Sequence, residues 1–282
     1  MTGFTTLSGK TIPPLFYGTA WKKTASASLV ALALSKGFRA IDTACQPKHY
    51  QEALVGQGIM QPPAIAREDL FLQTKFTLSA GQDPNNIPYD INARLEDQVR
   101  QSFAKSLENL QTNYLDAILM HSPARSVSDT CSVMKVFNSF KDKGQVRYIG
   151  ISNIYSLPLL REICAQLPPS TVNIVQNRFY AATGYDVDIR AFCKENGIMY
   201  QSFWTLTGNP MVLSNPIVRR IAKIHGISEA GVFYRFCTQN GITVLDGTTS
   251  EEHMAEDLKI VTDDTIALSE DEMSDIWSCC ER

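Results

Sequence analysis

The sequence has little excess charge of either sign and no long apolar run. Its 282 residues carry 26 lysines and arginines against 29 aspartates and glutamates, and no stretch of five like charges occurs. This distribution lacks the basic patch that nucleic-acid binding requires. The apolar stretches near the N-terminus are far shorter than the roughly 18 to 20 residues of a membrane-spanning helix. We therefore expect a protein without an export signal that binds neither nucleic acid nor a membrane.

The sequence also lacks the cysteine and histidine spacing of a stabilised extracellular or metal-binding chain. Seven cysteines are odd in number and scattered, the four histidines form no HxH or HExxH motif, and no Asn-x-Ser/Thr acceptor is present. This usage predicts reduced thiols in the cytoplasm and no metal site. The remaining composition, 44% apolar and 20% charged, is that of an ordinary globular chain.

Short apolar runs alternate with longer segments of helical spacing along the whole chain. Alternation of this kind favours a parallel sheet, and eight such units predict a (β/α)8 TIM barrel, with a doubly wound sheet as the alternative. We expect one barrel domain over residues 1–282, and the N-terminal β-hairpin at 5–13, which lies within it, is expected to plug the barrel bottom. The predicted strands are 15–19, 39–44, 70–75, 116–121, 146–151, 173–176, 198–203 and 243–245. The predicted helices lie near 24–36, 50–60, 91–111, 129–143, 156–166, 185–196, 214–225, 228–239 and 250–259, with a further helix-like stretch at 269–280.

Ionisable side chains fall at the carboxyl ends of three predicted strands, where a barrel builds its active site. Asp42 and Lys75 end neighbouring strands, so they are expected to form a buried pair, either a structural salt bridge or part of a catalytic group. A buried ammonium lowers the pKa of a nearby phenol, and the nearest phenol in the sequence is that of Tyr50. His121 ends an apolar strand, from which its imidazole could hydrogen-bond a substrate oxygen.

Four segments surround these strand ends: Gly37-Phe38-Arg39-Ala40-Ile41-Asp42-Thr43-Ala44, Thr74-Lys75, Leu119-Met120-His121-Ser122-Pro123 and Gly144-Gln145-Val146-Arg147-Tyr148-Ile149-Gly150-Ile151-Ser152-Asn153. Together they resemble the signatures of the aldo-keto reductase family. This resemblance implies a nicotinamide-dependent barrel that reduces an aldehyde or ketone by hydride transfer. It implies that Tyr50 is the general acid, that Asp42 and Lys75 tune its phenol, and that His121 orients the carbonyl.

The chain departs from the family at the catalytic tyrosine. The family places that tyrosine five residues after the Asp, where this chain has Pro47, whereas Tyr50 lies eight residues after it. We interpret the difference as a three-residue insertion in the preceding loop, as in a fungal and plant-like subgroup. If the loop turns Tyr50 outward, His49 is the alternative acid, or the protein is a regulatory barrel that binds cofactor with little or no turnover.

The resemblance also implies where cofactor and substrate bind. NADPH is the expected cofactor, with NADH possible, because the family's two adenine-end cations are replaced here by Gly247 and His253. The family's C-terminal extension is missing, so we expect an open pocket for an apolar or aromatic carbonyl, in a monomeric protein. The expected cofactor-binding residues are Gly18, Thr19, Ala20, Trp21, Asp42, Ser152, Asn153, Gln176, Phe203, Trp204, Thr205, Leu206, Gly247, Thr248, Thr249, His253, Glu256 and Asp257. The expected substrate residues are Trp21, Tyr50, Phe76, His121, Ser122 and Trp204.

Overall fold

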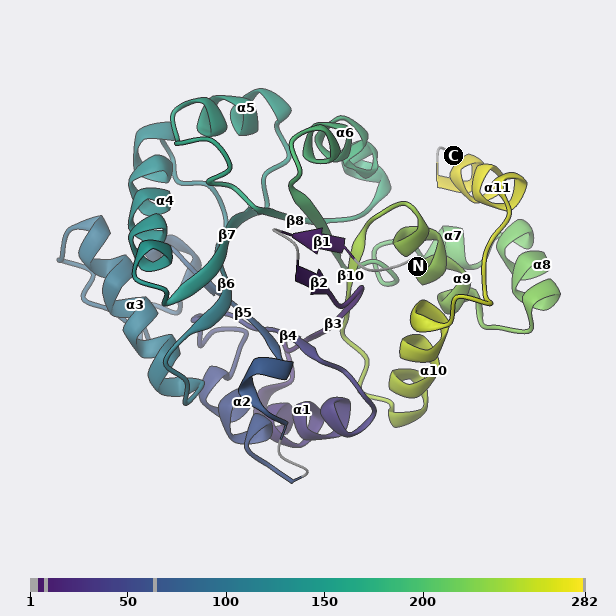
Figure 1. Ribbon diagram of the computed structural model, residues 1–282, viewed down its shortest axis with the longest axis horizontal. Coiled ribbons are helices and arrows are strands. Elements are labelled where there is room, and N and C mark those ends of the chain that lie inside the picture. Colours follow the sequence, from purple (N-terminus) through teal and green to yellow (C-terminus); the bar gives the residue numbers. More distant parts are fainter. Residues whose placement is uncertain (1–4, 8–9, 63–64, 281–282) are drawn as a thin grey trace.

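Eight parallel strands close into a barrel in the computed structural model, which describes residues 5–7, 10–62 and 65–280. The strand order is β10-β3-β4-β5-β6-β7-β8-β9, and the helices surround the ring (Figure 1). The last strand pairs with the first, with Leu245 opposite Phe16, so the sheet has no open edge. The (β/α)8 barrel is therefore confirmed, and the doubly wound alternative is wrong.

The observed strands begin and end within two residues of the predicted bounds. The predicted helix near 91–111 begins later, at Leu95, because the Asp90 carboxylate accepts the Asn92 N–H and turns the chain. The strands are β1 Thr5–Leu7, β2 Lys10–Ile12, β3 Leu15–Gly18, β4 Ala40–Asp42, β5 Phe71–Phe76, β6 Leu115–Met120, β7 Val146–Ser152, β8 Ile174–Arg178, β9 Met199–Phe203 and β10 Thr243–Asp246. The helices are α1 Ser26–Ser35, α2 Glu52–Ile59, α3 Leu95–Asn109, α4 Val127–Asp142, α5 Leu157–Ala165, α6 Val187–Glu195, α7 Pro210–Leu213, α8 Pro216–His225, α9 Glu229–Gln239, α10 Glu251–Thr262 and α11 Glu270–Cys280.

Serine side chains fix where several helices begin. Helices α4, α5, α9 and α10 follow Ser126, Ser156, Ser228 and Ser250, and each serine hydroxyl accepts a backbone N–H three residues on. Such caps satisfy donors that the first helical turn leaves free. None of the described helices is long and apolar enough to cross a membrane.

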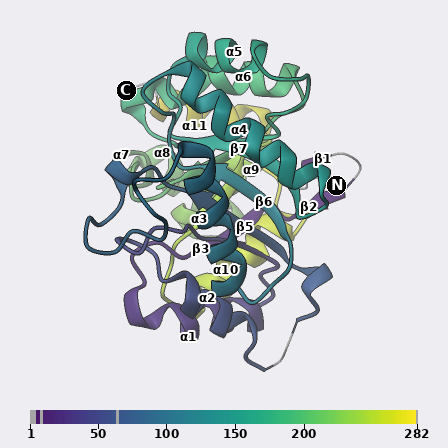
Figure 2. The same cartoon turned by 90° about the vertical axis from the view of Figure 1, so that its left-hand side faces the viewer.

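The N-terminal hairpin lies across one opening of the barrel. Strands β1 and β2 pair antiparallel, with Thr5 opposite Ile12, while the predicted turn at Ser8-Gly9 lies outside the described residues. Ile12 is fully buried and packs in the cluster that fills the amino end of the barrel. Figures 1 and 2 show the hairpin beside the ends of the strands, as expected for a plug.

The barrel interior has an apolar layer below a polar one, because side chains alternate along each strand. In β5, Phe71 joins the apolar interior cluster, and Gln73 and Lys75 follow on the same face. In β8, Ile174 is succeeded in the same way by Gln176 and Arg178. The apolar layer comprises Ile12, Phe16, Ala40, Phe71, Ala117, Leu119, Tyr148, Ile174, Met199 and Leu245. The polar carboxyl end is therefore where the strands can build a site.

Gly150 of β7 lies where the packing around the strand leaves no room for a side chain. A Cβ atom at this position would lie 2.3 Å from the Ile174 carbonyl oxygen and 2.7 Å from Leu119 Cδ2. We predict that Gly150→Ala lowers the free energy of unfolding in urea by about 2 kcal/mol, since neighbouring backbone must move. Gly247→Ala is the matched control, because its Cβ would meet nothing nearer than Lys22 Nζ at 3.9 Å. Equal unfolding midpoints for the two variants would contradict this account.

Candidate active site

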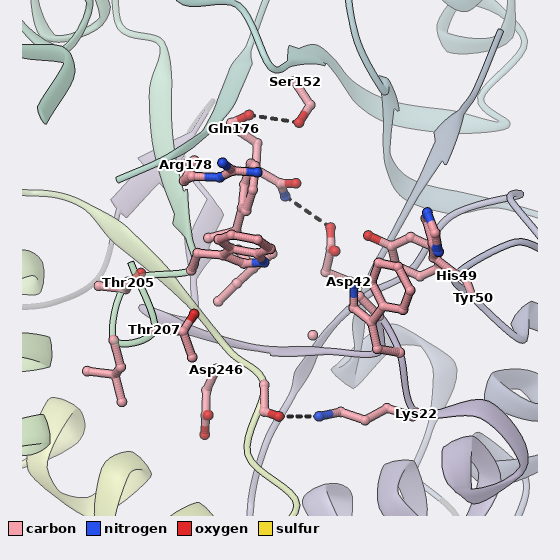
Figure 3. Close-up of a pocket in the computed structure, with 18 of the residues that line it drawn as sticks. Lys22, Asp42, His49, Tyr50, Ser152, Gln176, Arg178, Thr205, Thr207 and Asp246 are labelled. Atoms are coloured by element: carbon pink, nitrogen blue, oxygen red, sulfur yellow. Dashed lines mark hydrogen bonds between the residues drawn. The ribbon is translucent and has the colours of Figure 1, made fainter. Parts of the chain in front are cut away.

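A cavity of about 610 Å³ opens at the carboxyl ends of the barrel strands (Figure 3). Its wall combines strand ends with the loops that follow β3, β4, β9 and β10. The lining residues are Gly18, Ala20, Trp21, Lys22, Asp42, Gln46, His49, Tyr50, His121, Ser152, Asn153, Gln176, Arg178, Phe203, Trp204, Thr205, Leu206, Thr207, Tyr234, Leu245, Asp246, Gly247 and Thr248.

An ion pair lies at the floor of this cavity. Lys75 Nζ donates to Asp42 Oδ2 at 2.5 Å and to the Thr43 carbonyl oxygen at 3.0 Å, and both charged side chains are almost fully buried. Burial lowers the pKa of Lys75, and the Asp42 carboxylate opposes that shift. The pair predicted from the ends of neighbouring strands is therefore present.

Three glutamine side chains complete the environment of Asp42. Its Oδ1 accepts from Gln73 Nε2 at 2.7 Å and from Gln176 Nε2 at 3.0 Å. Both amides also donate to Gln201 Oε1 at 2.8 Å, and Gln201 Nε2 donates back to Gln73 Oε1 at 3.1 Å. An ionised carboxylate only accepts, so Asp42 sets the direction of every amide in the network. The side-chain oxygen Oε1 of Gln176 is consequently the end of this amide that is left to accept a hydrogen bond.

Tyr50 reaches the ion pair in spite of the insertion. Residues 46–50 form a tight turn in which the N–H groups of His49 and Tyr50 both donate to the Gln46 carbonyl oxygen. The Tyr50 ring centroid lies 5.3 Å from Lys75 Nζ and 5.9 Å from the His121 ring, in an edge-on arrangement. Burial and the Asp42 charge raise the pKa of the phenol above its usual range, so Tyr50 holds its proton and the lowering expected from the buried ammonium is wrong.

His121 stands beside Tyr50 as a neutral group. Its Nδ1 hydrogen-bonds Thr77 Oγ1 at 2.6 Å. Burial, together with the charges of Lys75 and His49, lowers the pKa of the imidazole to about 3. The ring therefore stays uncharged at neutral pH, and its Nε2 is available to a ligand in the cavity.

Amides, a hydroxyl and aromatic rings line the side of the cavity formed by β7, β8 and β9. Asn153 adopts a left-handed backbone with φ of 54° and donates from Nδ2 to the His121 carbonyl oxygen at 2.9 Å. Ser152 Oγ donates to the backbone carbonyl oxygen of Gln176 at 2.8 Å (Figure 3). Phe203 and Trp204 supply the aromatic wall beside them. Donors and acceptors next to aromatic rings suit an amide-bearing ring.

The opposite side of the cavity follows β10. Lys22 donates to the Gly247 carbonyl oxygen (Figure 3), and the Thr248 N–H donates to Asp246 Oδ1 at 2.8 Å. Asp246 Oδ2 is buried without a hydrogen-bond partner, and burial raises the pKa of this carboxyl to about 6. This side therefore carries one cation and one carboxyl that faces the cavity.

Most of the predicted site residues line the cavity, but two predicted substrate contacts do not. Phe76 points away from the barrel interior, since it alternates with Lys75, and it packs against Tyr89 at 5.6 Å in the outer core. Ser122 is exposed outside the cavity wall. The prediction for Phe76 is therefore wrong, whereas that for Ser122 stays a prediction. Within the described residues, Thr19, Lys75, Thr249, His253, Glu256 and Asp257 also lie outside the wall.

Several lining residues were not predicted from the sequence. Arg178 could have been found, because it follows Gln176 by two residues on the same face of β8. Lys22 directly follows the predicted Trp21. No local pattern points to Gln46, Thr207 or Tyr234, whose positions depend on loops and on helix α9. The remaining unpredicted residues are Leu245 and Asp246, while His49 entered only as an alternative acid.

The lining residues fit a nicotinamide dinucleotide. Four residues that line the cavity carry buried polar atoms without a hydrogen-bond partner, namely Gln46 Oε1, His49 Nδ1, Arg178 Nε and Asp246 Oδ2. An amide-binding side and a side with a cation match the two ends of that cofactor. Among the described residues, no group of three or more side chains could hold a metal ion.

In barrels of this kind, the cavity at the carboxyl ends of the strands is where enzymes bind small molecules. A model of the aldo/keto reductase family matches residues 5–281. The methylglyoxal reductase DkgB of Yersinia pestis is 30% identical over 240 residues, covering 81% of this chain and 79% of that protein. The glyoxal reductase of Bacillus subtilis (strain 168) is 30% identical over 250 residues, covering 88% and 80%.

A solved structure gives the same result. The aldo/keto reductase from Brucella melitensis superposes with a TM-score of 0.81 at 25% identity, covering 99% of this chain and 100% of that one. The chain belongs to the aldo/keto reductase family. It is therefore a carbonyl-reducing oxidoreductase of a family that uses nicotinamide cofactors, as the sequence resemblance implied.

The lowered pKa of His121 gives a pH dependence of stability. Between about pH 3 and 6.5, the unfolded chain binds a proton at His121 that the folded chain does not, so stability falls as the pH falls. We predict that wild type loses about 2 kcal/mol more than His121→Asn between pH 6.5 and pH 5. Urea unfolding across this range measures the difference. His253→Asn, at an exposed histidine, should keep the wild-type slope, and an unchanged slope in His121→Asn would contradict the assignment.

Proposed function

We propose that this protein reduces an aldehyde or ketone to the alcohol, with Tyr50 as the general acid. The observation that carries the proposal is the grouping of Tyr50 beside His121 and above the buried pair of Lys75 and Asp42. A phenol, a neutral imidazole and a buried cation on one cavity wall suit protonation of a carbonyl oxygen.

Each of these four residues has a separate role in the proposed reduction. The nicotinamide cofactor, when bound, supplies a hydride to the carbonyl carbon. His121 Nε2 donates a hydrogen bond that holds the carbonyl oxygen, since Thr77 occupies Nδ1. Tyr50 transfers its phenolic proton to that oxygen as negative charge develops there. Lys75 stabilises the phenolate that remains, and Asp42 keeps the ammonium in place.

The proposed cofactor is NADPH, with NADH as the alternative. Six further lining residues are proposed to contact the cofactor, namely Gly18, Ala20, Trp21, Asp42, Thr205 and Leu206. Ser250 caps helix α10, where backbone N–H groups and the hydroxyls of Thr248 and Thr249 suit a ribose phosphate. His253 lies in the first turn, and Glu256 and Asp257 follow on the same helix, where we propose that they contact the adenosine.

A regulatory barrel without turnover is the second candidate. It depended on Tyr50 being turned outward, whereas the Tyr50 ring lies over Lys75 and lines the cavity.

The names of the relatives suggest small dicarbonyls such as methylglyoxal and glyoxal as first substrates to assay. The aromatic wall of Trp21, Phe203 and Trp204 also supports an apolar or aromatic carbonyl.

We also propose that the enzyme acts as a monomer in the cytoplasm. Five cysteines carry free thiols, namely Cys45, Cys131, Cys164, Cys193 and Cys237. Thiols in that state suit a reducing compartment. The balanced charge of the sequence supports a small-molecule substrate as the partner rather than nucleic acid.

The two candidate acids are neighbours, so paired substitutions separate them. We predict that Tyr50→Phe lowers kcat by about 10² to 10⁴, because the proton donor is lost while the ring remains. His49→Gln should retain activity within about threefold, because the His49 ring packs against Trp21, with 3.7 Å between ring centroids, whereas the Tyr50 ring lies over Lys75. Consumption of NADPH or NADH at 340 nm, with methylglyoxal and with an aromatic aldehyde, measures both variants.

The outcome of this assay also separates the candidate functions. Cofactor binding, followed by tryptophan fluorescence, should be equal in wild type and Tyr50→Phe. A larger loss in His49→Gln than in Tyr50→Phe would transfer the acid role to His49. Tight cofactor binding by a wild type that turns over neither substrate would support the regulatory barrel instead.

A further inference from the structure

Arg178 is a charged residue of the cavity that the proposed reaction does not use. It is the last residue of β8 and points to the same face of the strand as Gln176. Two residues along a strand span roughly 7 Å, so the Arg178 side chain leaves β8 about that far beyond Gln176, toward the carboxyl end of the barrel. Figure 3 shows the guanidinium beside the cavity, on the side of Ser152 and Gln176.

Aromatic rings hold this guanidinium in place. It lies 4.0 Å from the centroid of the Trp204 ring and 5.2 Å from that of Tyr180. Trp204 has a left-handed backbone with φ of 56°, directly after β9, and its indole lines the cavity. The Arg178 N–H donates to Tyr155 Oη at 3.1 Å, which fixes the strand end below. An arginine stacked in this way loses little entropy when it binds an anion.

No acidic partner in the described part of the chain accounts for Arg178. None of the ion pairs among those residues includes it, and its Nε is buried without a hydrogen-bond partner. A guanidinium prefers a planar carboxylate, which accepts two parallel N–H bonds. A guanidinium that lines the cavity, is held by aromatic rings and forms no ion pair in the described part of the chain therefore indicates an anionic ligand in the cavity.

The other charges of the cavity place that anion on the substrate side. Asp42 is paired with Lys75, and Asp246 lies near Lys22 on the opposite side (Figure 3). Lys22 and the start of helix α10 already provide a cation and N–H groups for the cofactor phosphates. Arg178 instead stands above Gln176, on the amide side of the cavity, where both it and the Trp204 ring against which it packs line the wall.

We propose that Arg178 binds a carboxylate on the carbonyl substrate, so that the enzyme prefers an aldehyde or ketone that also carries an acid group. This inference rests on the proposed function and names its substrate class. The apolar walls of Trp21 and Trp204 then cover the carbon skeleton between the carbonyl and the carboxylate.

The test compares two aromatic aldehydes that differ in charge, and the ratio of variant to wild type is taken for each, so that their different reactivities cancel. These are 4-carboxybenzaldehyde and the neutral 4-nitrobenzaldehyde, in which a rigid ring separates the carbonyl from the second group. We predict that Arg178→Gln lowers kcat/KM for 4-carboxybenzaldehyde by about 10- to 100-fold and for 4-nitrobenzaldehyde by less than about threefold. Arg178→Lys should recover part of the loss, because lysine keeps the positive charge but cannot donate two parallel hydrogen bonds to a carboxylate. Arg219→Gln, at an exposed arginine of α8, controls for net charge and should match wild type.

The cofactor diphosphate is the competing anion, and a binding measurement distinguishes it. The dissociation constant of NADPH, from tryptophan fluorescence without substrate, should be the same in wild type and Arg178→Gln. A loss of NADPH affinity as large as the loss of kcat/KM would assign Arg178 to the cofactor and overturn the proposal. Equal losses on the two aldehydes would overturn it as well.

A second binding measurement keeps the proposal separate from the reaction. Benzoate and benzamide are unreactive analogues of the acid and neutral substrates. Calorimetry should show wild type binding benzoate more tightly than benzamide, and Arg178→Gln should abolish that preference. If wild type lacks turnover but prefers benzoate, the proposed function fails and Arg178 remains an anion site. If wild type reduces aldehydes but has no preference for the acid, only the role of Arg178 fails.

Discussion

The ion pair between Lys75 and Asp42 constrains most of the barrel interior. Two charges taken out of water need each other and further hydrogen bonds, or the fold loses several kcal/mol. Gln73, Gln176 and the Thr43 carbonyl supply those bonds. Because Asp42 only accepts hydrogen bonds, it orients the glutamine amides, and the oriented side chain of Gln176 presents its Oε1 atom at the cavity. A single charged contact thus links barrel stability to the shape of the ligand site.

The same pair explains how the displaced tyrosine is accommodated. A loop three residues longer than the family's can still bring a phenol over Lys75 if both of its ends are fixed. At one end the Trp21 N–H donates to the His49 carbonyl oxygen at 2.8 Å. At the other end buried Glu52 accepts from Thr74 Oγ1 at 2.5 Å, which anchors helix α2 to β5. Tyr50 lies between these anchors, so the extra residues bulge at Pro47 and Lys48 rather than at the phenol.

Strand order, barrel closure and the ion pair could be predicted from the sequence, because they depend on local alternation and on residues at strand ends. Phe76 was placed in the cavity wrongly, since the prediction ignored that it alternates with Lys75 across the sheet. Arg178 was overlooked although the same alternation places it above Gln176. Tyr234 and Thr207 could not be predicted, because their approach to the cavity depends on how helix α9 and the loop after β9 pack in three dimensions.

The central claim is that Tyr50 and His121 act on one carbonyl oxygen above the buried ion pair. The most direct test is a crystal structure of the protein with a nicotinamide cofactor and an unreactive carbonyl ligand. We predict that Tyr50 Oη and His121 Nε2 both lie within about 3 Å of the ligand oxygen, with Lys75 still bound to Asp42. A ligand oxygen bound by His49, with Tyr50 more than about 4 Å away, would contradict the account.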